Sequence, residues 1–359
     1  MCTMRRPVPP APRAADPPAA SSVRFSAPGV GAGLLVAGVV WTLCAGAVSG
    51  GNPLPVVGAM VGVGATFASA RLLGRIHRGI APAGVLLAAA LLAATSGRAV
   101  YDHGPLSAPF GYVNARGAFF ALAAIAGGVL AATLRRPAAV VGAALAAFAA
   151  ATVPLASGTE AAAIVVMGVP ALAWVAGRRG GSGASAVVCG AVLALALAAS
   201  FVAGATFRGQ AVGPERPLGV RRLELWHEAI AIIRREPLFG VGPGRFAKVS
   251  PTARTWPDTR WAHNGFLHQG AEQGVVGMAI LVAGFAWGFV SLGRRGDRVA
   301  VWGVAALAGT GLLASVDYVL HFPAIPLAAA GLVGTATARA APRRGPAGAG
   351  SRELGEEVL

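Results

Sequence analysis

The chain has 359 residues, of which 55% are hydrophobic and only 12% charged, and its mean hydropathy is +0.65. This composition excludes an ordinary soluble domain and is typical of a polytopic helical membrane protein. The formal charge of +16 would suggest nucleic acid in a soluble protein, but here it first reports membrane orientation, and we expect no nucleic-acid partner. The three cysteines have no metal-binding spacing, and we expect neither a metal nor a cofactor.

Residues 1–27 are rich in Pro, Ala and Arg and lack an apolar run, which predicts a disordered cytoplasmic tail and no signal peptide. About ten apolar runs of spanning length follow, and they predict an all-α transmembrane bundle. We expect transmembrane helices 1–7 within 28–205, a long external loop at 206–271, helices 8–10 within 272–338 and a cytoplasmic tail at 339–359. The runs lie at 29–48, 53–70, 80–96, 117–134, 137–156, 161–177, 186–205, 272–292, 299–316 and 322–338.

The distribution of basic residues predicts which side the loop faces. With both termini in the cytoplasm, 18 of the 30 lysines and arginines lie inside and the short outer connections hold only Arg98 and Arg116. The long external loop then carries ten basic against five acidic residues, which suggests an anionic partner, with lipid headgroups as the alternative. The ten are Arg208, Arg216, Arg221, Arg222, Arg234, Arg235, Arg245, Lys248, Arg254 and Arg260.

Two local patterns stand out in the loop. Apolar residues from Leu223 to Ile233 recur at three- and four-residue steps, which predicts an amphipathic helix that ends at Glu236 and could lie on the membrane surface. The glycines of GVGPG (240–244) then predict a tight turn whose backbone amides could approach an anion.

His263 is the first candidate for catalysis, because it lies just before the apolar run that begins near Glu272, at the predicted outer mouth of the bundle. A histidine can take a proton from a hydroxyl near neutral pH, and Asn264 could orient its ring or a substrate sugar. The alternative is a hydrogen-bonding histidine at the membrane interface. His268 is expected to be structural and His227 to lie on a solvated helix face.

Arg222 is the candidate anion ligand, because an arginine fork can hold two phosphate oxygens. The alternative is a surface salt bridge with Glu224 or Glu228. Two further acids lie at outer ends of spans: Glu272, which we expect to satisfy amides at a helix start, and Asp317, which could pair with a loop arginine.

These motifs, in this order, resemble the O-antigen ligase and O-antigen polymerase group of integral membrane glycan transferases. The likeness is carried by Arg222-Leu-Glu-Leu-Trp226, by Glu236 through Phe246 with its glycines, and by His263-Asn264 with Leu267, Glu272, Gly274 and Gly277. Weaker likenesses lie at Pro109–Asn114 and at Asp317–Pro323, so that the resemblance touches most of the chain.

The resemblance implies a GT-C-like bundle in the cytoplasmic membrane that works without metal. The donor would be an undecaprenyl-diphosphate-linked glycan and the acceptor a glycan or lipid-glycan hydroxyl on the outer face. His263 would act as the base and Arg222 would hold the leaving diphosphate. The candidates for substrate binding are Asn264, Arg98, Arg116, Arg245, Arg254, Arg260 and Trp226.

The chain departs from the family at one place, where Ser157-Gly-Thr-Glu160 stands for the family's Ser-Arg-Gly element. A second diphosphate contact would then have to come from Arg98, Arg116, Arg254 or Arg260. Besides ligase or polymerase, two alternatives stay open: a lipid-linked glycan transporter, for which the sequence offers no inverted repeat, and a noncatalytic family member that binds its ligand.

Overall fold

The computed structural model describes residues 27–97, 110–134, 136–156, 159–208, 218–256 and 259–338. Within these ranges the regular structure is entirely helical, so the predicted all-α fold is confirmed. The elements are α1 (Ala27–Ser49), α2 (Leu54–Ile76), α3 (Ile80–Ser96), α4 (Val113–Thr133), α5 (Pro137–Ala156), α6 (Glu160–Thr206), α7 (Leu218–Arg235), α8 (Phe246–Val249), α9 (Pro251–Thr255), α10 (Gly265–Gly293), α11 (Arg298–Val316), the 3-10 helix η3 (Val319–His321) and α12 (Ala324–Thr337).

Seven of the described helices are long and apolar enough to cross a membrane, namely α1, α2, α4, α5, α6, α10 and α11, and α3 and α12 are shorter apolar helices. Every predicted span falls on one of these nine helices. Helix α6 accommodates two predicted spans, because non-helical backbone at Gly180 and Gly181 divides it. The chain is therefore a polytopic helical bundle.

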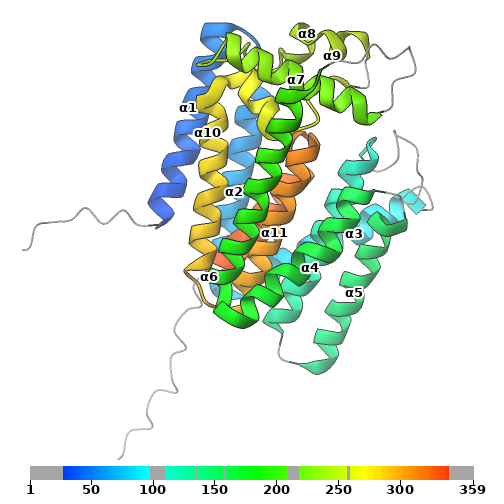
Figure 1. Ribbon diagram of the computed structural model, residues 1–359. Helices are drawn as coiled ribbons and strands as arrows, with labels where there is room; N and C mark the ends of the chain where they lie inside the picture. The colour runs from blue at the N-terminus through cyan, green and yellow to red at the C-terminus, as the bar shows by residue number, and fades with distance from the viewer. Residues whose placement is uncertain are drawn as a thin grey trace, which may run out of the picture.

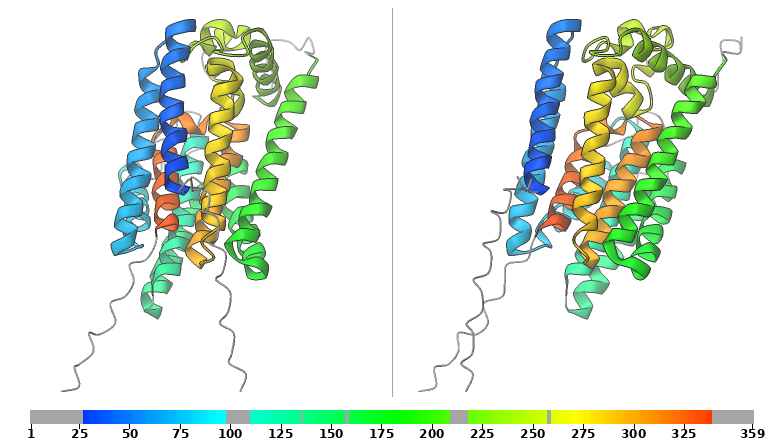
Figure 2. Two further views of the ribbon diagram at one scale, coloured as in Figure 1. Left: turned by 90° about the vertical axis from the view of Figure 1, so that its left-hand side faces the viewer. Right: turned by 60° about the vertical axis from the view of Figure 1, so that its left-hand side comes forward.

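The bundle has two distinct ends. At one end α7, α8 and α9 lie together across the tops of the long helices (Figure 1). The connection between α1 and α2 contacts this group of helices through the backbone N–H of Asn52, which donates to Pro243 O at 3.0 Å. Figure 2 shows the same arrangement from two further sides. At the opposite end Arg78 pairs with Asp297 at 2.9 Å and donates to Ala338 O. The predicted cytoplasmic side corresponds to this second end.

Helices α4 and α11 form the centre of the bundle, where small residues let the helices approach closely. A Cβ at Gly128 of α4 would lie 2.4 Å from the indole of Trp302 on α11, and one at Gly309 would lie 2.8 Å from Val165 on α6. Close contact of this kind is how helices associate in a membrane, where the hydrophobic effect no longer drives them together. The abundance of Ala and Gly in these spans is therefore a packing requirement.

Helix α10 begins seven residues before the apolar run predicted from Glu272, and it is broken in the middle. The predicted start was wrong because Asn264 caps the helix at Gly265, ahead of the apolar run, and the polar segment from His268 to Gln273 is helical too. At Gly274 the backbone is left-handed (φ 70°). The break frees carbonyls, and those of Ala271 and Gln273 accept from Val241 N at 3.0 Å and from the Trp41 indole at 2.8 Å.

The glycine turn is packed against this break instead of being open to an anion. Gly240, Gly242 and Gly244 all have positive φ, and a Cβ at Gly242 would lie 1.9 Å from Gly50 O. The amides of Gly244 and Phe246 donate to the two carboxylate oxygens of Glu272, at 2.8 and 2.9 Å. The turn does bind an anionic group, but the group is the protein's own side chain.

We expect Gly274→Ala to destabilise the protein strongly. A Cβ there would lie 1.8 Å from Leu238 O, and the left-handed backbone alone costs an L residue about 1–2 kcal/mol. Gly284→Ala on the same helix is the matched control, since its Cβ would meet nothing within 4 Å. Thermal unfolding of the two purified variants in detergent measures the difference, and equal melting temperatures would contradict this account of the break.

Candidate functional site

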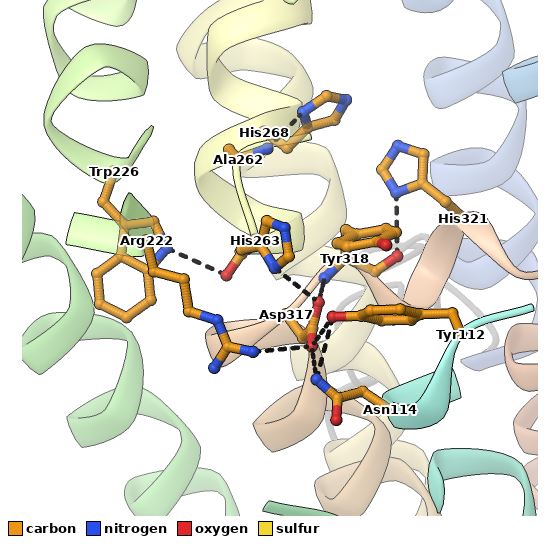
Figure 3. Close-up of polar contacts among 10 residues, drawn as sticks. All are labelled: Tyr112, Asn114, Arg222, Trp226, Ala262, His263, His268, Asp317, Tyr318 and His321. Carbon is orange, nitrogen blue, oxygen red and sulfur yellow. Dashed lines mark hydrogen bonds and ion pairs between the residues drawn. The ribbon is translucent and has the colours of Figure 1, made fainter. Parts of the chain in front are cut away.

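The site is built around one buried carboxylate, that of Asp317, which follows α11 and is 3% exposed. Three groups donate hydrogen bonds to it (Figure 3). The Tyr112 hydroxyl and the Asn114 amide reach Oδ2 at 2.7 and 2.5 Å, and the backbone N–H of Tyr318 reaches Oδ1 at 2.7 Å. Tyr112 and Asn114 belong to the start of α4, about two hundred residues away in the sequence.

Arg222 and His263 converge on this carboxylate from the loop, as Figure 3 shows. The Arg222 Nη2 atom lies 3.7 Å from Oδ2 of Asp317, and His263 Nδ1 lies 3.3 Å from Oδ1. The histidine contact is close enough for an ion pair but is not aligned as a hydrogen bond. The other ring nitrogen, Nε2, is buried and has no hydrogen-bond partner among the described residues.

The electrostatics of Asp317 follow from these neighbours. Burial alone would raise the pKa of the Asp317 carboxyl, but the His263 ring, the Arg222 guanidinium and the Tyr112 hydroxyl together lower that pKa below its ordinary value. Burial and the nearby carboxylate raise the pKa of Tyr112 instead. Asp317 is therefore held as an anion, and Tyr112 is held as a neutral hydrogen-bond donor.

Helix α7 carries Arg222, and several other residues of this helix have partners away from Asp317. Its apolar face packs on α6 and α10 and is buried in the protein, not at the membrane surface that the sequence allowed for. Glu228 caps α9 by accepting from the backbone N–H of Thr252 at 3.1 Å, from its hydroxyl at 2.7 Å and from the Ser250 hydroxyl. Arg221 stacks over the Trp256 ring, 4.8 Å from its centroid. Glu228 therefore does not take the place of Asp317 beside Arg222.

The backbone at His263 and Asn264 is fixed by side chains. His263 has φ 49°, the only positive φ outside glycine in the described part of the chain. Its carbonyl accepts the Trp226 indole N–H at 3.1 Å. Asn264 caps α10 by accepting from Phe266 N and Leu267 N, each at 3.0 Å, and its amide donates to Ser315 O at 2.6 Å.

The structure describes four of the five arginines that were predicted to bind substrate. Arg116 is wholly buried near the start of α4. Arg245 donates to the Ser49 carbonyl next to the glycine turn. Arg254 and Arg260 are exposed at the loop end of the bundle, and Arg98 lies outside the described residues. Since Asn264 and Trp226 are both engaged with protein groups, their observed contacts hold the site together.

Sequence reasoning missed Tyr112 and Asn114 as site residues. The only signal was the weak family likeness at Pro109–Asn114, which carried no role. It also missed an aromatic stack in which Tyr318 lies between Trp261 and Tyr112, with ring centroids 4.6 and 4.7 Å apart, and in which the His263 ring meets Tyr318 edge-on at 4.6 Å. The pairing of Asp317 with a loop arginine was predicted and is found.

A second polar cluster is formed by His268 and Glu272 of α10 and His321 of η3. His268 Nε2 lies 3.5 Å from Glu272, and its ring meets that of His321 at a centroid distance of 4.6 Å. Burial, with the neighbouring His268, lowers the pKa of His321 to about 3, so that its ring stays neutral. Glu272 was predicted to satisfy amides at the start of its own helix, but α10 begins at Gly265, and Glu272 instead accepts from the amides of Gly244 in the glycine turn and Phe246 at the start of α8. Among the described residues, no group of three or more His, Cys, Asp or Glu side chains is arranged to hold a metal ion.

The bundle and the site define a multi-pass membrane protein in which a histidine and an arginine share one buried carboxylate at the loop end. A carboxylate facing Nδ1 leaves Nε2 to accept a proton, and a guanidinium beside it can hold an anion. The protein family described as O-antigen ligase matches residues 144–282 of this chain. This match supports assigning the chain to the O-antigen ligase and polymerase family, as its motifs predicted. No curated protein matches the chain.

The matched segment runs from α5 into α10 and therefore contains α7, the glycine turn and His263. Asp317, Tyr112 and Asn114 lie outside it. The matched segment thus contains Arg222 and His263. The carboxylate that both approach, that of Asp317, lies after the matched segment in the sequence.

We expect Asp317→Asn to lower stability at neutral pH but to matter less in acid. Because the folded pKa lies below the unfolded value of about 3.9, the charged carboxylate stabilises the fold above that value, and its contribution disappears as the pH falls through the folded pKa. Melting temperatures of wild type and variant between pH 6 and pH 3 should converge toward the acid end. A gap that is constant or that widens in acid would contradict the assigned ionisation.

Proposed function

We propose that the protein transfers a glycan from an undecaprenyl-diphosphate-linked donor to an acceptor hydroxyl on the outer face of the cytoplasmic membrane, as an O-antigen ligase or polymerase does. The observation that carries the proposal is the convergence of His263 and Arg222 on Asp317, within 3.3 and 3.7 Å of one carboxylate. A proton acceptor and an anion ligand held this close suit a reaction in which a hydroxyl loses a proton and a diphosphate leaves.

In the proposed reaction, the acceptor oxygen attacks the anomeric carbon of the donor and its proton passes to Nε2 of His263. The bond from that carbon to the diphosphate oxygen breaks, and the electron pair leaves with the diphosphate. Asp317 facing Nδ1 orients the ring and balances the positive charge that His263 gains. Nε2 is buried and has no hydrogen-bond partner in the part of the chain that the structure describes, which supports this assignment.

Arg222 supplies the second half of the proposed reaction by holding the leaving diphosphate. Its contact with Asp317 is long, and its side chain is 34% exposed, whereas the side chain of Asp317 is only 5% exposed. Asp317 already accepts three shorter hydrogen bonds, so Arg222 can turn toward a phosphate without leaving the carboxylate unsatisfied. A guanidinium can then form paired, charge-assisted bonds to phosphate oxygens.

The proposed location of the reaction follows from the two ends of the bundle. Two of the arginines that the positive-inside rule assigns to the cytoplasm, Arg78 and Arg295, both donate to Ala338 O at the end opposite the loop. Both termini would then be cytoplasmic, and the His263 end would face outward, where a translocated lipid-linked donor presents its diphosphate.

His263→Ala should abolish transfer and leave an inserted, folded protein. Removing a general base typically costs about 10²–10⁴-fold in rate. His227→Ala is the matched control, because His227 is an exposed histidine of α7 whose ring contacts only Gly204 O among the described polar groups. The measurement is product formation in a strain that lacks the gene and carries each variant. Full activity of His263→Ala would remove the mechanism.

Arg222→Ala should reduce transfer by about 10²–10³-fold, as expected for the loss of a group that stabilises charge in the transition state. Arg234→Ala, an exposed arginine on the same helix, is the control and should behave like wild type. The assay is turnover in proteoliposomes, with the lipid-linked glycan that accumulates in the deletion strain as donor. Equal turnover of the two variants would assign the diphosphate to another residue.

A further inference from the structure

We propose that Trp226 is a positioning residue, whose indole N–H holds the His263 backbone in its left-handed conformation and so aims the ring at Asp317. The inference rests on the proposed function for its consequence in catalysis, but the positioning itself is a structural statement. With 9% of its surface exposed, Trp226 has little of its ring to offer a substrate, which was the role that the sequence suggested for it.

The backbone at His263 needs an external support. L residues adopt positive φ infrequently, and such conformations persist only where the surroundings over-determine them. The His263 carbonyl points back to α7, where the buried Trp226 Nε1 donates to it at 3.1 Å. Asn264 fixes the next residue by capping α10. His263 is therefore held from both sides.

The same helix that holds the His263 backbone also presents Arg222. Arg222 and Trp226 are four residues apart on α7 and so lie one above the other on a single face. The helix itself is fixed, because the Trp226 Cβ packs against Gly204 of α6 so closely that a Cβ at Gly204 would lie 2.9 Å from it. One turn of α7 thus sets the separation of the base from the anion ligand.

Trp226→Phe removes the N–H and keeps an aromatic ring. We expect kcat to fall about 10- to 100-fold, the scale of a small misplacement of a reacting group, while the donor KM stays near the wild-type value. The donor is the lipid-linked glycan of the deletion strain, and membranes of that strain supply the acceptor. Replacing the Trp226 indole by benzothiophene, which keeps the shape and removes only the N–H, should give the same loss even if Trp226→Phe folds poorly.

Trp41→Phe is the matched control. The Trp41 indole donates to the carbonyl of Gln273 in α10 at 2.8 Å, so this variant loses the same kind of bond at a place remote from His263. We expect it to lower the melting temperature and to leave kcat unchanged. If Trp226→Phe kept wild-type kcat, or if Trp41→Phe lost as much, the positioning role would be refuted.

A measurement without substrate separates this inference from the proposed function. Hydrogen exchange followed by mass spectrometry should show faster exchange of the amides around His263 in Trp226→Phe and no such change there in Trp41→Phe. Unchanged exchange in Trp226→Phe would overturn the inference even if the protein is a transferase. A wild-type protein that never turns over would refute the proposed function, and exchange would still decide the role of Trp226.

Discussion

The burial of one charge, the carboxylate of Asp317, is the constraint on which the site depends. A carboxylate removed from water is tolerated only when hydrogen bonds and opposite charges replace its hydration. Here Tyr112 and Asn114 at the start of α4 and the backbone N–H of Tyr318 provide the hydrogen bonds, Arg222 provides the opposite charge, and the His263 ring lies beside Oδ1. To bring these groups together, the start of α4, the start of α10 and the end of α11 must lie at the same level of the bundle, beside α7.

A second buried carboxylate, that of Glu272, organises the loop itself. It occupies the amides of the glycine turn, while the break at Gly274 frees carbonyls that bind the rest of that turn and the Trp41 indole. The two carboxylates differ in what faces them. The groups around Glu272 are mutually satisfied. Asp317 is flanked by a ring nitrogen of His263 that has no hydrogen-bond partner among the described residues and by the partly exposed side chain of Arg222, which is why chemistry is proposed at Asp317 and not at Glu272.

Hydropathy alone predicted the spans, because each transmembrane helix must be apolar over its whole length. It misplaced the start of α10, since the polar residues from His268 to Gln273 face protein partners and not lipid. His263 and Arg222 were predicted from motifs, but Tyr112 and Asn114 were not, because a hydroxyl and an amide two hundred residues from Asp317 leave no periodic pattern. The glycine turn was predicted to meet an anion, and the sequence could not show that Glu272 supplies it.

The geometry of Arg222 explains how a site already filled by an ion pair could accept a diphosphate. At 3.7 Å the contact between Arg222 and Asp317 is too long for a charge-assisted hydrogen bond, and the Arg222 side of the pair is partly exposed to water. Paired bonds from a guanidinium to phosphate are stronger and shorter. Exchange of Asp317 for a phosphate is therefore favourable for Arg222, and its cost to Asp317 is small, because Tyr112, Asn114 and the Tyr318 amide remain in place. The carboxylate thus keeps His263 oriented while Arg222 is released to the donor.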